Sequence, residues 1–119
     1  MKEKKPKIYI AGPMCGFPDF NYPAFNHAAR KLRAMGWHVE NPAEIGKRYG
    51  TPEQINADPA LLAAVMAADI HALEKCDAVF LLCGWQDSIG ARKELGVVIG
   101  NNKPIFLAPI YPPSRICEP

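Results

Sequence analysis

Two carboxylates stand where a helix would present apolar side chains to the core. Glu94 follows Ala91 by three residues and precedes Val98 by four, so on a helix it shares their apolar stripe. Asp69 repeats the pattern four residues after Val65. Burial of an unpaired carboxylate is costly, so each is expected either to have a structural partner or to be kept for function with a shifted pKa.

Paired carboxylates at one site predict cleavage of a glycosidic bond, in which one attacks or stabilises the anomeric carbon and the other handles a proton. Glu94 falls in the second turn of its predicted helix, where the helix dipole favours the ionised form of a nucleophile. The simpler alternative is a structural ion pair between Glu94 and Arg92, Lys93 or another lysine.

The sequence GWQDSIG, residues 84–90, leads into the N-terminus of this helix. Backbone N–H groups and the Ser88 hydroxyl would form an anion site there, which suits a phosphate. Ordinary N-capping by Ser88 or Asp87, with Gly90 allowing close packing, has equal weight. Trp85 would either stack on a base or cover the end of a sheet.

Four apolar runs predict the strands that position these residues, at 7–11, 37–40, 77–83 and 104–108. Helical periodicity fills the intervals, from 23 to 36, from 60 to 75 and from 88 to 101. Residues 43–59 are polar and rich in turns, so we expect a long excursion there, a lid or rim with at most one short helix.

This alternation predicts a single α/β domain over residues 1–119, a flavodoxin-like doubly wound parallel sheet with strand order 2-1-3-4. Its ligand should lie beyond the carboxyl ends of strands one and three. That rule selects the loop of residues 84–90 and the loop that begins with Gly12 and Pro13. Tyr9, in strand one, would send its hydroxyl to this site or pack in the core.

One tension concerns Asp69. If residues 60–75 form one straight helix antiparallel to the strands, Asp69 lies well below the carboxyl edge of the sheet. A break in the helix near Ala67 would bring Asp69 closer to that edge.

Composition excludes several other function classes. The chain has 119 residues, 49% of them apolar, which suits one domain. Fourteen basic against twelve acidic residues give a net charge of +2, and the lysines of the first seven residues exceed that excess, so no basic face for nucleic acid is expected. No apolar run is long enough to span a bilayer, and a cytoplasmic protein is expected.

The four cysteines form no C-x-x-C pair and only three histidines accompany them. We expect four reduced thiols, no metal site and no cofactor.

Three segments together resemble the nucleoside 2-deoxyribosyltransferase superfamily: YIAGP at 9–13, FNYPAF at 20–25 and DSIGARKELG at 87–96, with Asp69 and Asp77 eight residues apart. The resemblance spans residues 7–108 and is closest to a small phage and bacterial branch. At the 84–90 loop the chain is similar to 2'-deoxynucleoside 5'-monophosphate N-glycosidases. Residues 43–59 have no counterpart that we can place.

The resemblance implies that Glu94 is the nucleophile, that Tyr9 orients it and that Asp69 assists the departing base. Six residues before the nucleophile, transferases acting on nucleosides have an Asp on the sugar 5'-hydroxyl, whereas the monophosphate glycosidases have a Ser on the phosphate. Ser88 has that place here, with Asp87 directly before it, so the substrate is a nucleoside or a nucleoside 5'-monophosphate.

Gly12, Pro13, Trp85 and Gly90 complete the expected binding residues. The relatives also imply a homodimer or larger homo-oligomer. Two other classes of function stay open: a catalytically silent nucleotide-binding or sensing module, and an interaction domain whose acids are merely paired.

Overall fold

Four short parallel strands form the sheet in the computed structural model, which describes residues 6–14 and 16–107. They are β1 (Lys7–Ala11), β2 (His38–Glu40), β3 (Ala78–Leu81) and β4 (Ile105–Leu107). Their order is β2-β1-β3-β4, and every pair is parallel. The predicted α/β class and the strand order 2-1-3-4 are confirmed, although Ala108 of the fourth predicted strand lies outside the described residues.

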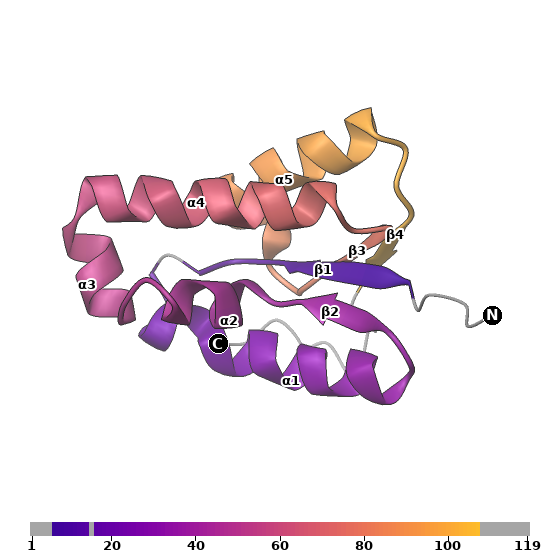
Figure 1. Ribbon diagram of the computed structural model, residues 1–119, viewed down its shortest axis with the longest axis horizontal. Helices are drawn as coiled ribbons and strands as arrows, with labels where there is room; N and C mark the ends of the chain where they lie inside the picture. The colour runs from indigo at the N-terminus through magenta and orange to yellow at the C-terminus, as the bar shows by residue number, and fades with distance from the viewer. Residues whose placement is uncertain (1–5, 15, 108–119) are drawn as a thin grey trace.

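Helices cover both faces of this sheet (Figure 1). Helix α1 (Tyr22–Ala34) lies on one face, and α4 (Pro59–Glu74) and α5 (Ile89–Gly100) lie on the other. Two short 3-10 turns, Pro18–Asn21 and Trp85–Asp87, precede α1 and α5. The crossovers place the N-terminal end of each helix at the carboxyl edge of the strands.

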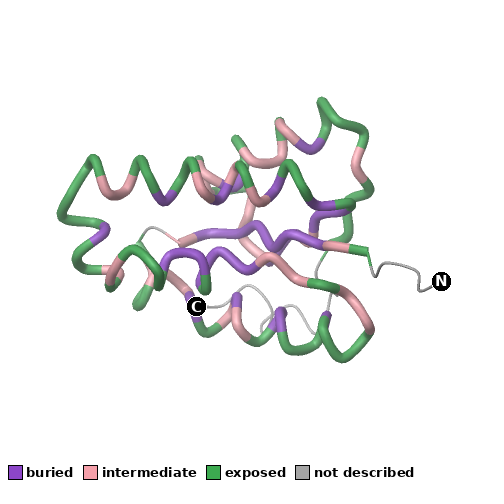
Figure 2. The backbone as a smooth tube through the Cα atoms, in the orientation of Figure 1, coloured by how far each residue is buried: buried purple, intermediate pink, exposed green. Residues whose placement is uncertain are grey.

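Alternation along β1 divides the core into two parts. Ile8 and Ile10 pack with α1 on one face, whereas Tyr9 and Ala11 belong to the cluster formed with α4 and α5 on the other. Figure 2 shows β1 buried along most of its length. The side chain of Tyr9 is therefore directed toward the two helices that carry the suspected carboxylates.

The excursion after β2 contains two helices, α2 (Pro42–Lys47) and α3 (Pro52–Ala57), so the prediction of at most one short helix was wrong. Each begins with a side-chain cap followed by proline, whose fixed φ suits the first helical turn. The Asn41 side chain accepts a hydrogen bond from the Ala43 amide, and Thr51 forms a reciprocal capping box with Gln54.

Two further expectations are tested by the described residues. Cys76 is a buried free thiol, but Cys83 is disulfide-bonded, so the prediction of four reduced thiols was wrong at that position. Of the helices in the described ranges, none has the length and apolar character that crossing a membrane requires.

Candidate active site

A short hydrogen bond connects the first strand to the last helix. The Tyr9 hydroxyl donates to Glu94 Oε2 at 2.6 Å. Tyr9 is completely buried, because its ring packs in the cluster between the sheet and the helices α4 and α5. The two alternatives for Tyr9 are therefore both realised, since the ring fills the core and the hydroxyl reaches the predicted nucleophile.

Asp69 reaches the same place from α4. This helix is unbroken from Pro59 to Glu74, so the break that we considered near Ala67 does not exist. Asp69 lies five residues before the end of the helix, about 7.5 Å along its axis. Tyr9 also lies before the carboxyl edge, because it pairs with Val79, the second residue of β3. The site is thus recessed below the carboxyl edge of the sheet.

Burial controls the protonation of both acids. It raises the pKa of Glu94 to about 7, and the hydrogen bond from Tyr9 acts in the opposite direction. It raises the pKa of Asp69 to about 8, to which the nearby Glu94 charge contributes. Burial therefore acts against the ionised form of Glu94 that the helix dipole was expected to favour. Near pH 7 the pair therefore holds at least one proton, mostly on Asp69.

Glu94 is not held in an ion pair by any described residue. The ion pairs within the described ranges join Lys7 to Glu40 and Arg33 to Glu44, both at the surface. Arg92 and Lys93, the neighbours that a structural explanation would have needed, are both exposed. The structural alternative for Glu94 therefore has no partner in this part of the chain.

One oxygen of Asp69 is also without a hydrogen bond. The residue is only 7% exposed, and its Oδ1 has no donor among the described residues. A buried unsatisfied carboxyl oxygen costs about 1–3 kcal/mol or more. Retention of such a group near a second, partly buried acid is typical of a functional site.

Ser88 begins α5 and caps it, with its Oγ accepting a hydrogen bond from the Ala91 amide at 3.1 Å. Asp87 is exposed and does not supply the cap. A Cβ atom on Gly90 would meet nothing closer than Ser88 Oγ at 3.9 Å. Packing within the described chain therefore does not require this glycine. The Ala91 amide already donates to Ser88, which leaves the Ile89 and Gly90 amides of the first turn for an anion.

The remaining predicted binding residues bring the loops after β1 and β3 together. A Cβ atom on Gly12 would lie 2.7 Å from Leu82 Cβ, so only glycine allows this close approach. Pro13 is buried, and its carbonyl accepts a hydrogen bond from Asn21 at 3.0 Å. Trp85 is half-buried and packs against the cluster around Tyr9. Of its two expected roles, stacking on a base or covering the end of the sheet, this packing corresponds to the second. Contact of these residues with a substrate stays a prediction.

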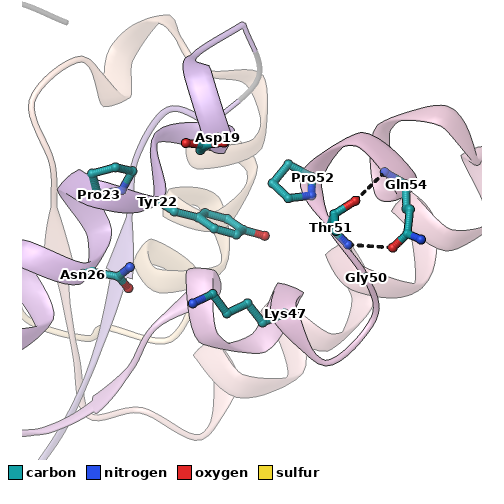
Figure 3. Close-up of a pocket in the computed structure, with 9 residues that line it drawn as sticks. All are labelled: Asp19, Tyr22, Pro23, Asn26, Lys47, Gly50, Thr51, Pro52 and Gln54. Carbon is teal, nitrogen blue, oxygen red and sulfur yellow. Dashed lines mark hydrogen bonds between the residues drawn. The ribbon is translucent and has the colours of Figure 1, made fainter.

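Sequence reasoning missed Tyr22, the first residue of α1. Burial raises the pKa of its hydroxyl, and the Asp69 charge raises it further. The hydroxyl makes no hydrogen bond to another described residue. Tyr22 also lines a cavity of about 590 Å³ formed by α1, α2 and α3 (Figure 3). Nothing in the periodicity of the chain distinguishes this tyrosine from an ordinary core aromatic.

No group of three or more His, Cys, Asp or Glu within residues 6–14 and 16–107 is arranged to hold a metal ion. What the site does contain is the buried Asp69 of α4 and the partly buried Glu94 of α5, which accepts a hydrogen bond from Tyr9.

Residues 6–106 match a family model described as a domain of unknown function, DUF4406. No curated protein matches the chain.

Proposed function

The chain belongs to the DUF4406 family, whose description gives no activity, and from its site we propose an N-glycosidase or 2-deoxyribosyltransferase-like enzyme acting on nucleosides or nucleoside 5'-monophosphates. The observation that carries this proposal is the hydrogen bond of 2.6 Å from Tyr9 to Glu94, together with the buried Asp69, whose charge raises the pKa of Tyr9. The resemblance to the nucleoside 2-deoxyribosyltransferase superfamily supports the same residues in the same roles.

In the first step, the free carboxylate oxygen of Glu94 attacks the anomeric carbon C1' of the sugar. A bond forms between that oxygen and C1', and the C1'–N bond breaks with its electron pair going to the base. Protonated Asp69 donates its proton to the leaving nitrogen. Tyr9 holds Oε2 of Glu94 and leaves Oε1 to react, so the hydroxyl is a positioning group.

In the second step, water or a second base attacks C1' of the glycosyl ester. Asp69, now ionised, accepts the proton of the attacking group, and the C1'–O bond breaks to regenerate the Glu94 carboxylate. A pKa of about 8 for Asp69 and about 7 for Glu94 suits this division of roles near neutral pH. The scheme uses no metal or cofactor.

The 5'-phosphate is proposed to bind at the start of α5. The Ser88 hydroxyl accepts from the Ala91 amide and can still donate its own hydrogen to a phosphate oxygen. Gly90 presents no side chain there, and the helix N-terminus favours an anion. A nucleoside with a free 5'-hydroxyl would instead meet Asp87.

The decisive experiment incubates the protein with nucleosides and 5'-monophosphates of each common base, in ribose and deoxyribose forms, and measures free base by chromatography. Base release supports the proposal, and release only with added acceptor base identifies a transferase. Tight binding without release from any compound would contradict the enzyme and favour the silent nucleotide-binding module.

We also propose a homo-oligomer. Met66 on α4 and Ile89 and Ile99 on α5 are 39%, 67% and 62% exposed, which leaves apolar surface on the helices of one face. Association of two copies would cover it, which is valuable for a domain of this size. Light scattering that shows a strict monomer at high concentration would contradict this proposal.

A cytoplasmic location is the third part of the proposal, because nucleotides are intracellular substrates. The disulfide at Cys83 argues in the other direction, since disulfides are rare in the cytosol. Subcellular fractionation combined with thiol counting decides between them.

A further inference from the structure

A cavity of about 590 Å³ lies between the start of α1, the end of α2 and the start of α3 (Figure 3). Two of its walls belong to the excursion, which has no counterpart in the resemblance. A Cβ atom on Gly46 would collide with the Tyr22 hydroxyl, so only glycine lets α2 lie this close to α1. None of the residues proposed to act in catalysis or to hold the phosphate lines this cavity, so it is separate from the site of the proposed reaction.

The chain that enters this cavity before α1 is a strained turn. Asp19, Phe20 and Asn21 have φ values of 52°, 54° and 61°, in the left-handed region that residues other than glycine rarely adopt. Two hydrogen bonds hold the turn, from Asn21 Nδ2 to the Pro13 carbonyl at 3.0 Å and from the Phe20 amide to the Phe17 carbonyl at 3.1 Å. Backbone strain that neighbouring groups maintain in this way is typical of functional sites. Here it fixes the position of Asp19 at the cavity.

Two opposite charges line the cavity without pairing. The side chains of Asp19 and Lys47 are both exposed, and neither makes a hydrogen bond or ion pair with another described residue. In Figure 3 they lie on opposite sides of the Tyr22 ring. The cavity therefore has an acidic end and a basic end.

The basic end also contains a hydrogen-bond donor of fixed orientation. Asn41 Oδ1 accepts a hydrogen bond from the Ala43 amide at 3.0 Å, so the Asn41 nitrogen donates to Asn26 Oδ1, also at 3.0 Å. The Asn26 NH2 group is then left as a donor. Asn26 lies on the same side of the Tyr22 ring as Lys47 (Figure 3). An ammonium and an amide donor together suit a carboxylate.

Flat and apolar surfaces separate the two ends. Tyr22, Pro23 and Pro52 contribute their rings to the lining. Thr51 and Gln54 are polar, but each accepts a hydrogen bond from the backbone amide of the other. The unpartnered charges of Asp19 and Lys47 are therefore the groups that should select a ligand.

We propose that this cavity binds a small zwitterion, a molecule with a flat apolar body whose ammonium group faces Asp19 and whose carboxylate faces Lys47 and Asn26. A purely anionic ligand would meet the like charge of Asp19, and a purely cationic one that of Lys47, which is unfavourable. The cavity volume falls in the usual range of about 300–1,000 Å³ for sites that bind small molecules.

The test uses three probes that share one flat ring and differ in charge: 4-(aminomethyl)benzoate, benzylamine and benzoate. Two-dimensional NMR titration of the protein measures each dissociation constant from the backbone amide shifts. We expect 4-(aminomethyl)benzoate to bind most tightly and to shift amides of the excursion and of the start of α1. Absence of saturable shifts with the zwitterion, or equal affinity for all three probes, overturns the proposal.

Two variants assign the charges. Asp19→Asn removes the carboxylate and keeps the turn, because asparagine also tolerates the left-handed region. It should weaken the zwitterion and benzylamine by about 3-fold, the size expected for an exposed ion pair, and leave benzoate unchanged. Lys47→Met keeps the apolar stem and should weaken the zwitterion and benzoate by about 3-fold, with benzylamine unchanged. A variant that weakens benzylamine and benzoate equally overturns the assignment of the two ends.

Lys31→Met and Glu74→Gln are the matched controls, because each removes one exposed charge that does not line the cavity. Neither should change any of the three affinities. The melting temperature of Asp19→Asn and Lys47→Met should equal that of the wild type, since both side chains are exposed and without described partners. Equal loss of zwitterion binding in the controls would show a general effect of net charge and would overturn the site.

Discussion

Tyr9 and Glu94 are 85 positions apart in the chain, and the hydroxyl of one donates a hydrogen bond of 2.6 Å to Oε2 of the other. The bond forms because Tyr9 faces the α4 and α5 side of the sheet and Glu94 lies on the inward stripe of α5. It ties the orientation of the carboxylate to the strand that forms the centre of the core. The charge of the Glu94 carboxylate and its orientation can therefore be tested with separate variants.

Removal of the charge should abolish chemistry and leave the fold intact. Glu94→Gln keeps the shape and can still accept a hydrogen bond from Tyr9, but its amide is not a nucleophile. We expect base release to fall by at least roughly 1,000-fold while nucleotide binding persists. Since no described cation depends on Glu94, the melting temperature should stay the same or rise. The exposed Glu74→Gln serves as control, and surviving base release in Glu94→Gln would end the covalent mechanism.

Removal of the Tyr9 hydroxyl should shift the pH dependence of base release. The hydrogen bond from Tyr9 lowers the pKa of Glu94, so Tyr9→Phe should raise it further above about 7. We expect about a 10-fold loss of base release at pH 7 and partial recovery as the pH is increased. A loss of equal size at every pH would mean that Tyr9 only supports packing.

The rate itself should follow a bell-shaped dependence on pH. Glu94 must lose its proton, with a pKa of about 7, and Asp69 must keep its own, with a pKa of about 8. Base release should therefore be fastest between these values. Asp69→Asn should remove the alkaline limb and slow release most for bases that leave poorly. An alkaline limb that survives in Asp69→Asn would assign it to another group.

Stability should change with pH in a direction set by the same two residues. Their pKa values are raised on folding, so between about pH 4 and pH 8 the folded state binds more protons than the unfolded state. Their contribution to stability is fully present below the unfolded values and is lost as the pH rises through the folded ones. The melting temperature should therefore fall from pH 5 to pH 8. Asp69→Asn should flatten that slope, and an unchanged slope would mean that Asp69 is not buried in its acid form.

Much of this arrangement could be predicted from the sequence. Continuous apolar runs separated by helical periodicity determine a parallel sheet, and the handedness of its crossovers leaves few orders. The carboxylates of Glu94 and Asp69 were detectable because each interrupts an apolar stripe. The pKa values of these carboxylates could not be predicted, because their burial depends on how α4 and α5 pack on β1, and no local sequence pattern determines that packing.

The excursion shows the opposite case. Its polar composition obscured two helices that tertiary contacts and caps stabilise, although Thr51 and Gln54 at capping-box spacing around Pro52 were a usable signal. Tyr22 and Lys47 could not be recognised as partners of one cavity, because the cavity exists only when α2 lies against the start of α1. A pocket formed between separate helices cannot be predicted from the pattern of any one of them.

The last prediction concerns Ser88, where capping and phosphate binding coincide. Ser88→Ala removes both functions, so it should lower the free energy of unfolding by about 0.5–2 kcal/mol and also weaken monophosphate binding. Ser88→Asp separates them, because aspartate is an equally good cap while its charge repels a phosphate. We expect Ser88→Asp to melt like the wild type and to bind the monophosphate at least about 10-fold more weakly, an effect of the size lost with one charge-assisted hydrogen bond. Nucleoside binding should change much less, because a nucleoside brings no negative charge to the start of α5. Calorimetry with one nucleoside and its 5'-monophosphate measures the two affinities. Equal weakening of the two ligands would show that the phosphate does not bind at this end of the helix.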